Sequence, residues 1–218
     1  MSYKHIPYTT VWYEHPDVEA RAKEIGAAPT GTKSDGSPFY TFPILQDPNT
    51  GKAISDSGAI IEYLDDTYPD TPRLIPKECK TLQKAFRETF ISKVQPSWQF
   101  TIAGTHDVLS HRAQTHCRIR WEASWGMKVH EIYPKGNRRD EEWAKFEKAM
   151  GEIDAWMEKD QEFVMGDSLS AVDLDIVGFL LYWMGTWGLD SPEWKDASTW
   201  HDGRWSRFVQ NVEQYTIE

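Results

Sequence analysis

The sequence predicts an α/β domain followed by an all-helical domain. Strand and helix patterns alternate through the first 68 residues, and a proline-rich stretch follows them. Beyond that stretch the strand signals stop and helical periodicity dominates. We therefore expect an α/β domain at residues 1–68, a linker at residues 69–76 and a helical domain at residues 77–218.

The first strand and helix are predicted near the start of the chain. Tyr8 to Tyr13 (YTTVWY) is rich in aromatic and β-branched residues, which favour a strand. Pro16-Asp17 is a typical helix start, and we expect the helix to continue to Ile25 and to end at Gly26. Residues 27–37 are rich in Gly, Pro, Thr and Ser and are expected to form a loop.

A hairpin is predicted next, and it contains an unusual proline. Phe39 to Leu45 has the composition of a strand, but Pro43 cannot donate a hydrogen bond to a neighbouring strand. We therefore expect a cis peptide between Phe42 and Pro43, with exposed backbone at Phe42. Turn residues occupy positions 47–51, and Lys52 to Ser55 returns as the second strand.

The next helix begins at Ser55-Asp56-Ser57 and ends at Tyr68-Pro69. Its free N–H groups and the Ser57 hydroxyl could bind a carboxylate while Asp56 binds an ammonium, so a small zwitterion would suit this end. Plain N-capping is the alternative, because Ser and Asp are among the commonest caps. Near the other end, Asp65-Asp66 is expected to be a solvated pair.

Helical periodicity predicts three helices in the first part of the second domain. The first spans Cys79 to about Ile102 and should be kinked or divided at Pro96. A second spans Gln114 to about Ile132, and a third spans Asp140 to Lys159. The inner face of the third is apolar, with Trp143, Phe146, Met150, Ile153 and Met157.

The core helix of the second domain is predicted to follow a capping box. Ser170 and Asp173 are spaced so that each side chain can accept a backbone N–H at a helix start. The sequence after them is apolar nearly all round to residue 183, as expected of a buried helix. From Gly188 onward we expect irregular structure and one last helix near residues 204–214.

Composition narrows the classes of function. A net charge of -10, from 34 acidic and 24 basic side chains, disfavours nucleic acids and anionic membranes as partners. Cys79 and Cys117 show no metal or redox spacing, which suits a reducing compartment. The most apolar run, Ile176 to Gly185, is too short to span a bilayer, and no signal peptide is recognised. We expect a cytoplasmic protein.

Two further groups of residues are candidates for functional sites. His106, His111 and His116 are each five residues apart, so they would not share a helix face, and no metal site is expected. The sequence contains 11 tryptophans, and several could line a pocket for a flat apolar molecule, although core packing is the alternative for each. The pocket candidates are Trp98, Trp121, Trp125 and Trp187. Trp183, four positions before Trp187, is expected to lie with them.

Taken together, these motifs resemble the cytosolic glutathione transferase superfamily over essentially the whole chain. They are TFP before the hairpin, SDSGAI after it, the proline-rich linker and GDSLSAVDLDIVGF. The phrases IPYTTVWYEHPDVEARAKEIGAAPTG and DTPRLIP are similar to those of basidiomycete glutathione transferases.

The resemblance implies a fold and a set of ligands. It implies a thioredoxin-like N-terminal domain, an all-α C-terminal domain, a homodimer, and glutathione with a small apolar co-substrate as ligands. The backbone of Phe42 beside cis Pro43 would pair with the cysteinyl part of glutathione, and Asp56 and Ser57 would hold its γ-glutamyl end.

The sequence also departs from the family pattern. The family has a first strand and helix whose junction carries the residue that activates the thiol, and this chain begins where that helix normally ends. Ser2 and Tyr3 map to the far end of that helix, so no catalytic residue is assigned. The expected N-terminal fold is thus a truncated β-α-β-β-α unit.

The strand at Tyr8 to Tyr13 then lacks its usual central neighbour. It could pair directly with Phe39 to Leu45, receive a strand from another chain, or belong to a shortened form of a longer protein. We expect a glutathione transferase-like enzyme acting on an apolar aromatic or terpenoid electrophile. The alternatives are a glutathione-independent isomerase or cyclase and a non-catalytic ligand-binding protein.

Overall fold

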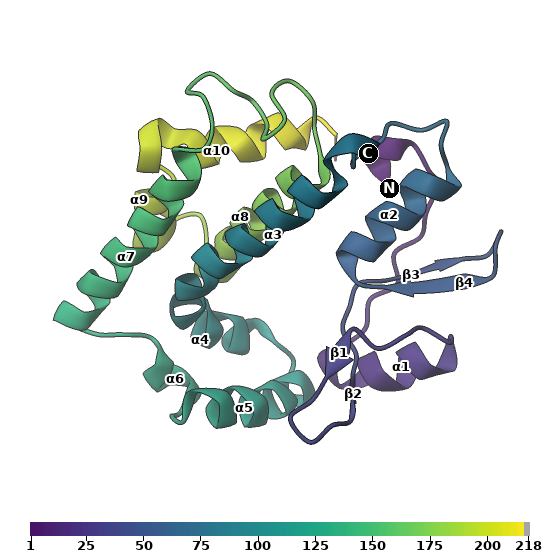
Figure 1. Ribbon diagram of the computed structural model, residues 1–218. Coiled ribbons are helices and arrows are strands. Elements are labelled where there is room, and N and C mark those ends of the chain that lie inside the picture. The colour runs from purple at the N-terminus through teal and green to yellow at the C-terminus, as the bar shows by residue number, and fades with distance from the viewer. Residues whose placement is uncertain (216–218) are drawn as a thin grey trace. The chain divides into compact units, whose positions relative to one another are not determined.

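The computed structural model describes residues 1–215, and the chain divides into two compact units. Met1 and Tyr3–Ile75 form the N-terminal unit, while Ser2 and the residues from Pro76 onward form the C-terminal unit. Within the described residues, no helix combines the length and apolar character needed to cross a bilayer. Figure 1 labels the helices and strands of both units.

The N-terminal unit contains short helices and two hairpins. Its elements in chain order are η1 (Ser2–Lys4), η2 (His15–Asp17), α1 (Val18–Glu24), β1 (Gly31–Thr32), β2 (Pro38–Phe39), β3 (Ile44–Asp47), β4 (Lys52–Ser55) and α2 (Ser57–Thr67). The first helix is confirmed, and it ends as expected before Gly26, which has a φ of 73°.

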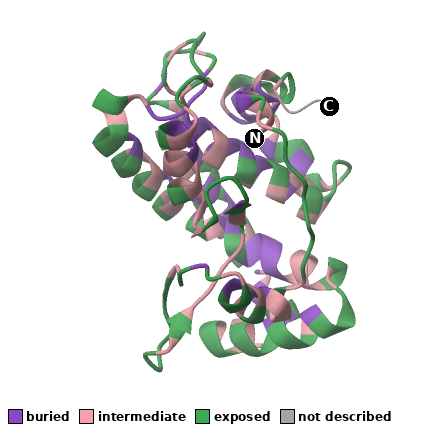
Figure 2. Cartoon of the chain, turned by 90° about the vertical axis from the view of Figure 1, so that its right-hand side faces the viewer, coloured by how far each residue is buried: buried purple, intermediate pink, exposed green. Residues whose placement is uncertain are grey.

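The predicted strand at Tyr8 to Tyr13 is wrong. Among the described residues this segment pairs with no strand, so the direct pairing with Phe39 to Leu45 does not occur either. The segment is exposed (Figure 2), and Trp12 retains 89% of its accessible surface. Strand composition alone does not produce a strand, because the backbone groups also need a neighbouring strand to bond.

The predicted strand from Phe39 to Leu45 is divided between two hairpins. β2 ends at Phe39 and pairs with β1, which lies in the stretch expected to be a loop. β3 begins only at Ile44, after Pro43, which has no N–H to donate to a neighbour. The β3–β4 hairpin has the expected place and turn, with Ile44 paired to Ser55 and Asp47 paired to Lys52.

A buried carboxylate joins the turn of the β3–β4 hairpin to α2. Asp47 is 4% exposed and accepts hydrogen bonds from the hydroxyls of Tyr63 at 2.6 Å and Tyr68 at 2.7 Å. These two hydroxyls lower the pKa of Asp47 below its ordinary value because they stabilise the carboxylate, and the hydroxyl of Tyr63 has the larger effect. The hairpin is thereby fixed against the helix that follows it.

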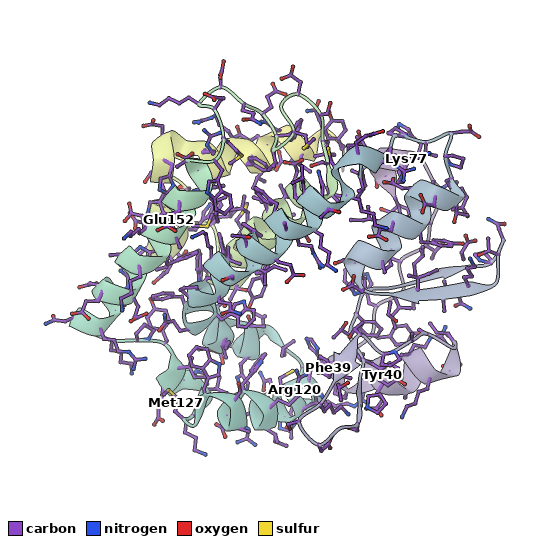
Figure 3. All side chains as sticks on the ribbon, in the orientation of Figure 1. Phe39, Tyr40, Lys77, Arg120, Met127 and Glu152 are labelled. Carbon is purple, nitrogen blue, oxygen red and sulfur yellow. The ribbon has the colours of Figure 1, made fainter. Side chains whose placement is uncertain are left out.

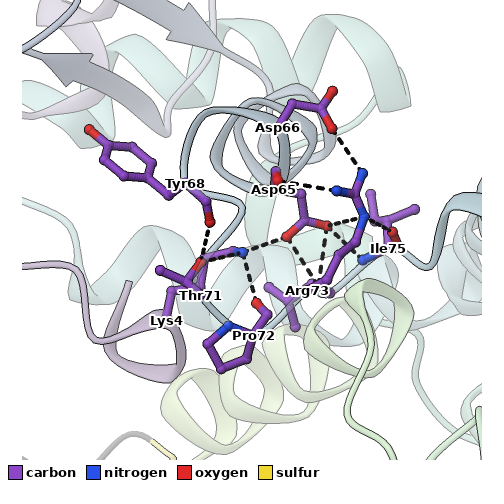
Figure 4. Close-up of polar contacts among 9 residues, drawn as sticks. Lys4, Asp65, Asp66, Tyr68, Thr71, Pro72, Arg73 and Ile75 are labelled. Carbon is purple, nitrogen blue, oxygen red and sulfur yellow. Dashed lines mark hydrogen bonds and ion pairs between the residues drawn. The ribbon is translucent and has the colours of Figure 1, made fainter.

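A second buried carboxylate, Asp65, lies near the C-terminal end of α2 (Figure 4). Asp65 forms an ion pair with Lys4 at 2.5 Å, and the two side chains are 0% and 1% exposed. It also accepts hydrogen bonds from the backbone N–H groups of Leu74 and Ile75, the latter at 2.8 Å. Only Asp66 is exposed as expected, so the prediction of a solvated pair was wrong for Asp65.

The C-terminal unit is all helical. Its elements are η3 (Lys77–Cys79), α3 (Lys80–Val94), η4 (Gln95–Ser97), α4 (Trp98–Val108), α5 (His111–Trp125), α6 (Val129–Ile132), α7 (Asn137–Asp154), α8 (Ala171–Trp187), α9 (Pro192–Ala197) and α10 (Trp200–Glu213). The division near Pro96 is confirmed.

Two predictions in this unit need correction. The helix expected over residues 114–132 is interrupted at Gly126, which adopts a left-handed conformation that side chains rarely tolerate and so ends α5. The tail after Gly188, expected to be mostly irregular, contains α9 as well as α10.

The core of this unit surrounds α8, which contacts α3, α4, α9 and α10 (Figure 1). The capping box at its start is confirmed, because Asp173 accepts hydrogen bonds from the backbone N–H and the hydroxyl of Ser170, at 2.7 and 2.6 Å. Burial raises the pKa of Asp173 despite these bonds. The predicted inner face of α7 is likewise buried, with Phe146 and Met150 both fully enclosed.

Candidate functional site

The open end of the β3–β4 hairpin brings the two sequence-predicted motifs together. Ile44 is paired with Ser55 at the end of the ladder. Because this pair ends the ladder, Phe42-Pro43 immediately precedes β3 and Asp56-Ser57 immediately follows β4 at the same end of the hairpin. Neighbouring strands lie about 4.8 Å apart, so a ligand at this end can contact both motifs.

The first motif presents unused backbone groups. The Phe42–Pro43 peptide is cis, as expected from the sequence. Among the described residues, no hydrogen bond joins the backbone N–H or C=O of Phe42 to another group. The centroid of the Phe42 ring lies 5.9 Å from that of the Tyr13 ring, so the two side chains pack together. An extended ligand could therefore pair with this backbone as a short strand does.

The second motif is the start of α2. Asp56 is the N-cap, and one of its carboxylate oxygens accepts a hydrogen bond from the N–H of Ala59 at 3.0 Å. Its φ of 77° and ψ of 128° form a combination that residues with side chains rarely adopt. Backbone conformations of this kind cost about 1–3 kcal/mol and concentrate at functional sites. Asp56 is thus capping and conformationally unusual at once.

The chemistry of this end suits a ligand with both charges. The first N–H groups of α2 and its helix dipole attract an anion such as a carboxylate. The Asp56 carboxylate supplies a negative charge within the same few residues, and a carboxylate has acceptor sites beyond the one that caps the helix. Beside them, Ser55 Oγ is buried without a hydrogen-bond partner among the described residues. An α-amino acid group matches this arrangement.

The N-terminal residues lie at the other end of α2. Lys4 is bonded to Asp65, Thr71 and Pro72, and Asp65 lies eight positions after Ser57 on α2. At 1.5 Å per residue this is about 12 Å along the helix axis. Tyr3 precedes Lys4 in the short helix η1, whose Lys4 marks the end of α2 away from Ser57.

The predicted pocket tryptophans fall into different parts of the C-terminal unit. Trp121 and Trp125 pack with Met127 (labelled in Figure 3) against a small cluster of Ile102, Val129 and Ile132 between α4, α5 and α6. Trp98 begins α4 and is 39% exposed.

Trp187 belongs to the main aromatic core instead. It stacks on Trp183 with a centroid distance of 5.8 Å, and its Nε1 donates a hydrogen bond to the carbonyl of Phe100 at 2.9 Å. In the described part of the chain, no ring contact joins Trp187 or Trp98 to the pair on α5.

The chain matches known families over both units. A family model described as the C-terminal domain of glutathione S-transferase matches residues 81–215, and one described as its N-terminal domain matches residues 1–67. Among curated proteins, the glutathione S-transferase-like protein ustS of Aspergillus flavus is 27% identical over 143 residues. That match covers 62% of this chain and 50% of the relative, so it spans half the length of ustS.

Solved structures show a closer likeness. A glutathione S-transferase of Ceriporiopsis subvermispora, crystallised in complex with glutathione, is 38% identical with a TM-score of 0.94. A glutathione transferase from Phanerochaete chrysosporium is 34% identical with a TM-score of 0.92. Each comparison covers 100% of this chain and 87% of the other. These likenesses confirm the predicted fold class, a thioredoxin-like N-terminal domain followed by an all-α domain.

Proposed function

The chain belongs to the glutathione S-transferase family, and we propose that it binds glutathione at the open end of the β3–β4 hairpin. The single observation that carries the proposal is the pairing of Ile44 with Ser55, which brings together the strand ends that adjoin Phe42-Pro43 and Asp56-Ser57. One motif offers unpaired backbone, and the other offers both an anion site and a carboxylate. Glutathione has a peptide backbone and a zwitterionic γ-glutamyl end, so each motif has a matching part of the ligand.

Each residue has a distinct role in this proposal. The N–H groups at the start of α2 and the Ser57 hydroxyl donate to the γ-glutamyl carboxylate. Asp56 keeps its bond to Ala59 with one oxygen and accepts from the γ-glutamyl ammonium with the other. The backbone of Phe42 pairs with the cysteinyl residue and orients its thiol.

Glutathione supplies a thiol nucleophile when it is bound, and we propose an apolar aromatic or terpenoid molecule as the electrophile. The support for an apolar co-substrate is the number of tryptophans in the C-terminal unit that retain exposed or half-buried faces, such as Trp98, Trp121 and Trp125. We also propose a cytoplasmic homodimer, because the chain resembles the glutathione transferase family. The residue that activates the thiol is not assigned.

Calorimetric titration with glutathione tests the site. In Asp56→Asn the amide still caps the helix but no longer carries charge, so the affinity should fall about ten- to a hundredfold while the fold is retained. Ser57→Ala should lower the affinity as well, because Ala keeps the helix and removes the hydroxyl. Asp70→Asn is the matched control, since Asp70 is exposed and lies outside the site. Equal affinities in all four proteins would disprove the assignment.

A second candidate function is ligand binding without turnover. The observation that favours it is the position of Tyr3 beside Lys4, about 12 Å along α2 from Ser57, which leaves the thiol without an assigned activating group. The two functions differ in the absorbance of the glutathione thiolate during a pH titration of the complex. A transferase lowers the thiol pKa of bound glutathione, whereas a binding protein leaves it near that of free glutathione. Turnover in glutathione-free buffer would instead indicate the glutathione-independent isomerase or cyclase.

A further inference from the structure

A cluster of three side chains that the glutathione site does not use lies where α4 meets α6. His106 and Asp107 come from the last turn of α4, and His130 comes from α6. One ligand atom from each lies within 4.8 Å of the others. We propose that this cluster binds a single divalent transition-metal ion of the zinc class, independently of glutathione.

The distances within the cluster match those of zinc ligands. Asp107 Oδ1 lies 3.2 Å from His106 Nδ1 and 3.6 Å from His130 Nε2. Two donor atoms bound tetrahedrally to one Zn²⁺ at 2.0–2.1 Å are separated by about 3.3 Å. Small side-chain rotations would therefore bring all three atoms onto one ion. Two imidazoles and one carboxylate are the donor set of many zinc and related sites.

The surroundings hold the ligands in place. The His106 side chain is only 13% exposed, and its ring contacts that of His130 edge to face at 5.5 Å. Beneath them, Ile102 on α4 packs against Val129 and Ile132 on α6, which keeps the two helices together. His130 and Asp107 are 62% and 60% exposed, so an ion can reach the cluster from solvent.

The electrostatics of the cluster favour a cation. His106 lies in the last turn of α4, where the helix dipole places partial negative charge, and Asp107 adds a full negative charge. Lys128, the cationic side chain that precedes α6, is paired with Glu122 at 3.4 Å. A second cationic side chain nearby is Arg118 on α5, which lines the pocket next to the cluster.

A fourth coordination position would open onto that pocket. The pocket has a volume of about 460 Å³ and is lined by both histidines of the cluster together with His111 and Glu122. Three protein ligands with an open fourth position are the arrangement of zinc sites that bind water or a small molecule. Mg²⁺ and Ca²⁺ are not expected here, because they prefer oxygen ligands.

The spacing of histidines along the sequence does not predict this metal site. His106, His111 and His116 do not form a set, because the ligand that completes the cluster is His130, which is on another helix. Its place depends on the end of α5 at Gly126, after which α6 begins at Val129 and packs against α4.

Calorimetry with Zn²⁺, on the full chain without a histidine tag, tests the proposal. We expect one equivalent to bind, and His130→Ala and Asp107→Asn to weaken binding at least tenfold, since even outer-shell partners are worth about 10–100-fold. Both residues are exposed, so these variants should remain folded. His116→Ala is the matched control, because His116 is exposed on α5 outside the cluster, and it should bind as the unchanged protein does.

Two further readouts separate this cluster from adventitious binding. Co²⁺ should give the strong visible absorption of tetrahedral coordination, and His106→Ala should abolish it. At a hundredfold excess over Kd, Zn²⁺ should raise the melting temperature by about 5–10 °C, whereas Mg²⁺ should not. The proposal is overturned if Zn²⁺ does not bind, or if His130→Ala and Asp107→Asn bind it as tightly as His116→Ala does.

Discussion

Replacing Asp65 with asparagine should be among the most destabilising single changes in the N-terminal unit. The substitution keeps the shape of the side chain but removes its charge, and Lys4 then remains as an ammonium that is 1% exposed and has lost its counterion. Breaking a buried ion pair from one side costs about 3–5 kcal/mol. The new amide would also have a single acceptor oxygen, whereas the Asp65 carboxylate uses both of its oxygens for the N–H groups of Leu74 and Ile75.

Amide hydrogen exchange at Leu74 and Ile75 measures this effect directly, because both N–H groups donate to Asp65. Tryptophan fluorescence is less suitable, since Trp12 is the only tryptophan before residue 76 in the sequence. A loss of 3–5 kcal/mol corresponds to exchange faster by about a hundredfold to a few thousandfold.

Asp66→Asn is the matched control for this experiment. Asp66 is the next residue on α2, its side chain is 69% exposed, and it pairs with Arg73 at 2.8 Å. An exposed pair of this kind contributes about 1 kcal/mol or less, so exchange at Leu74 and Ile75 should change little. Equal effects of the two variants on this exchange would refute a larger cost for the buried pair than for the exposed one.

Two other predictions concern carboxylates in the two units. Ser170→Ala removes a hydroxyl that donates a hydrogen bond to buried Asp173 at 2.6 Å. It should lower the free energy of unfolding by about 1–3 kcal/mol, measured by tryptophan fluorescence in urea. An unchanged free energy of unfolding would mean that the capping box does not stabilise α8. The pKa of Asp47 is lowered in the folded state by Tyr63 and Tyr68, so its stabilising contribution is complete above the unfolded pKa of about 3.9 and is lost as the pH falls through the lower folded pKa. Asp47→Asn should therefore lose less stability on acidification than the unchanged chain does, and parallel stability curves between about pH 5 and pH 2 would contradict this assignment.

Local patterns in the sequence were sufficient for most helices and for the local structure at Phe42-Pro43 and Asp56-Ser57. The cis Phe42–Pro43 peptide, the helix start at Ser57 and the Ser170–Asp173 capping box all occur where they were expected. Each depends on residues close together in the chain, because caps, turns and proline constraints act over a few positions. The hairpin register pairs Ile44 with Ser55, so the two motifs adjoin the same end of the ladder, and this register too follows from a short turn.

Local patterns were not sufficient where a residue depends on a distant partner. Tyr8 to Tyr13 has the composition of a strand, but it pairs with no strand among the described residues. The sequence predicts that Asp65 and Asp66 are both exposed. In the fold Asp65 is buried with Lys4, which lies 61 positions earlier in the chain.

The sequence by itself therefore determined the family, the succession of most helices and the local chemistry at Asp56 and Ser57. Only the tertiary structure decided which charges are buried, which apparent strand joins no sheet among the described residues, and that His130 lies beside His106 and Asp107. The physical reason is the range of the interactions. Helix caps and turns are bonded within a few residues, whereas burial and ligand geometry depend on elements that meet only after folding.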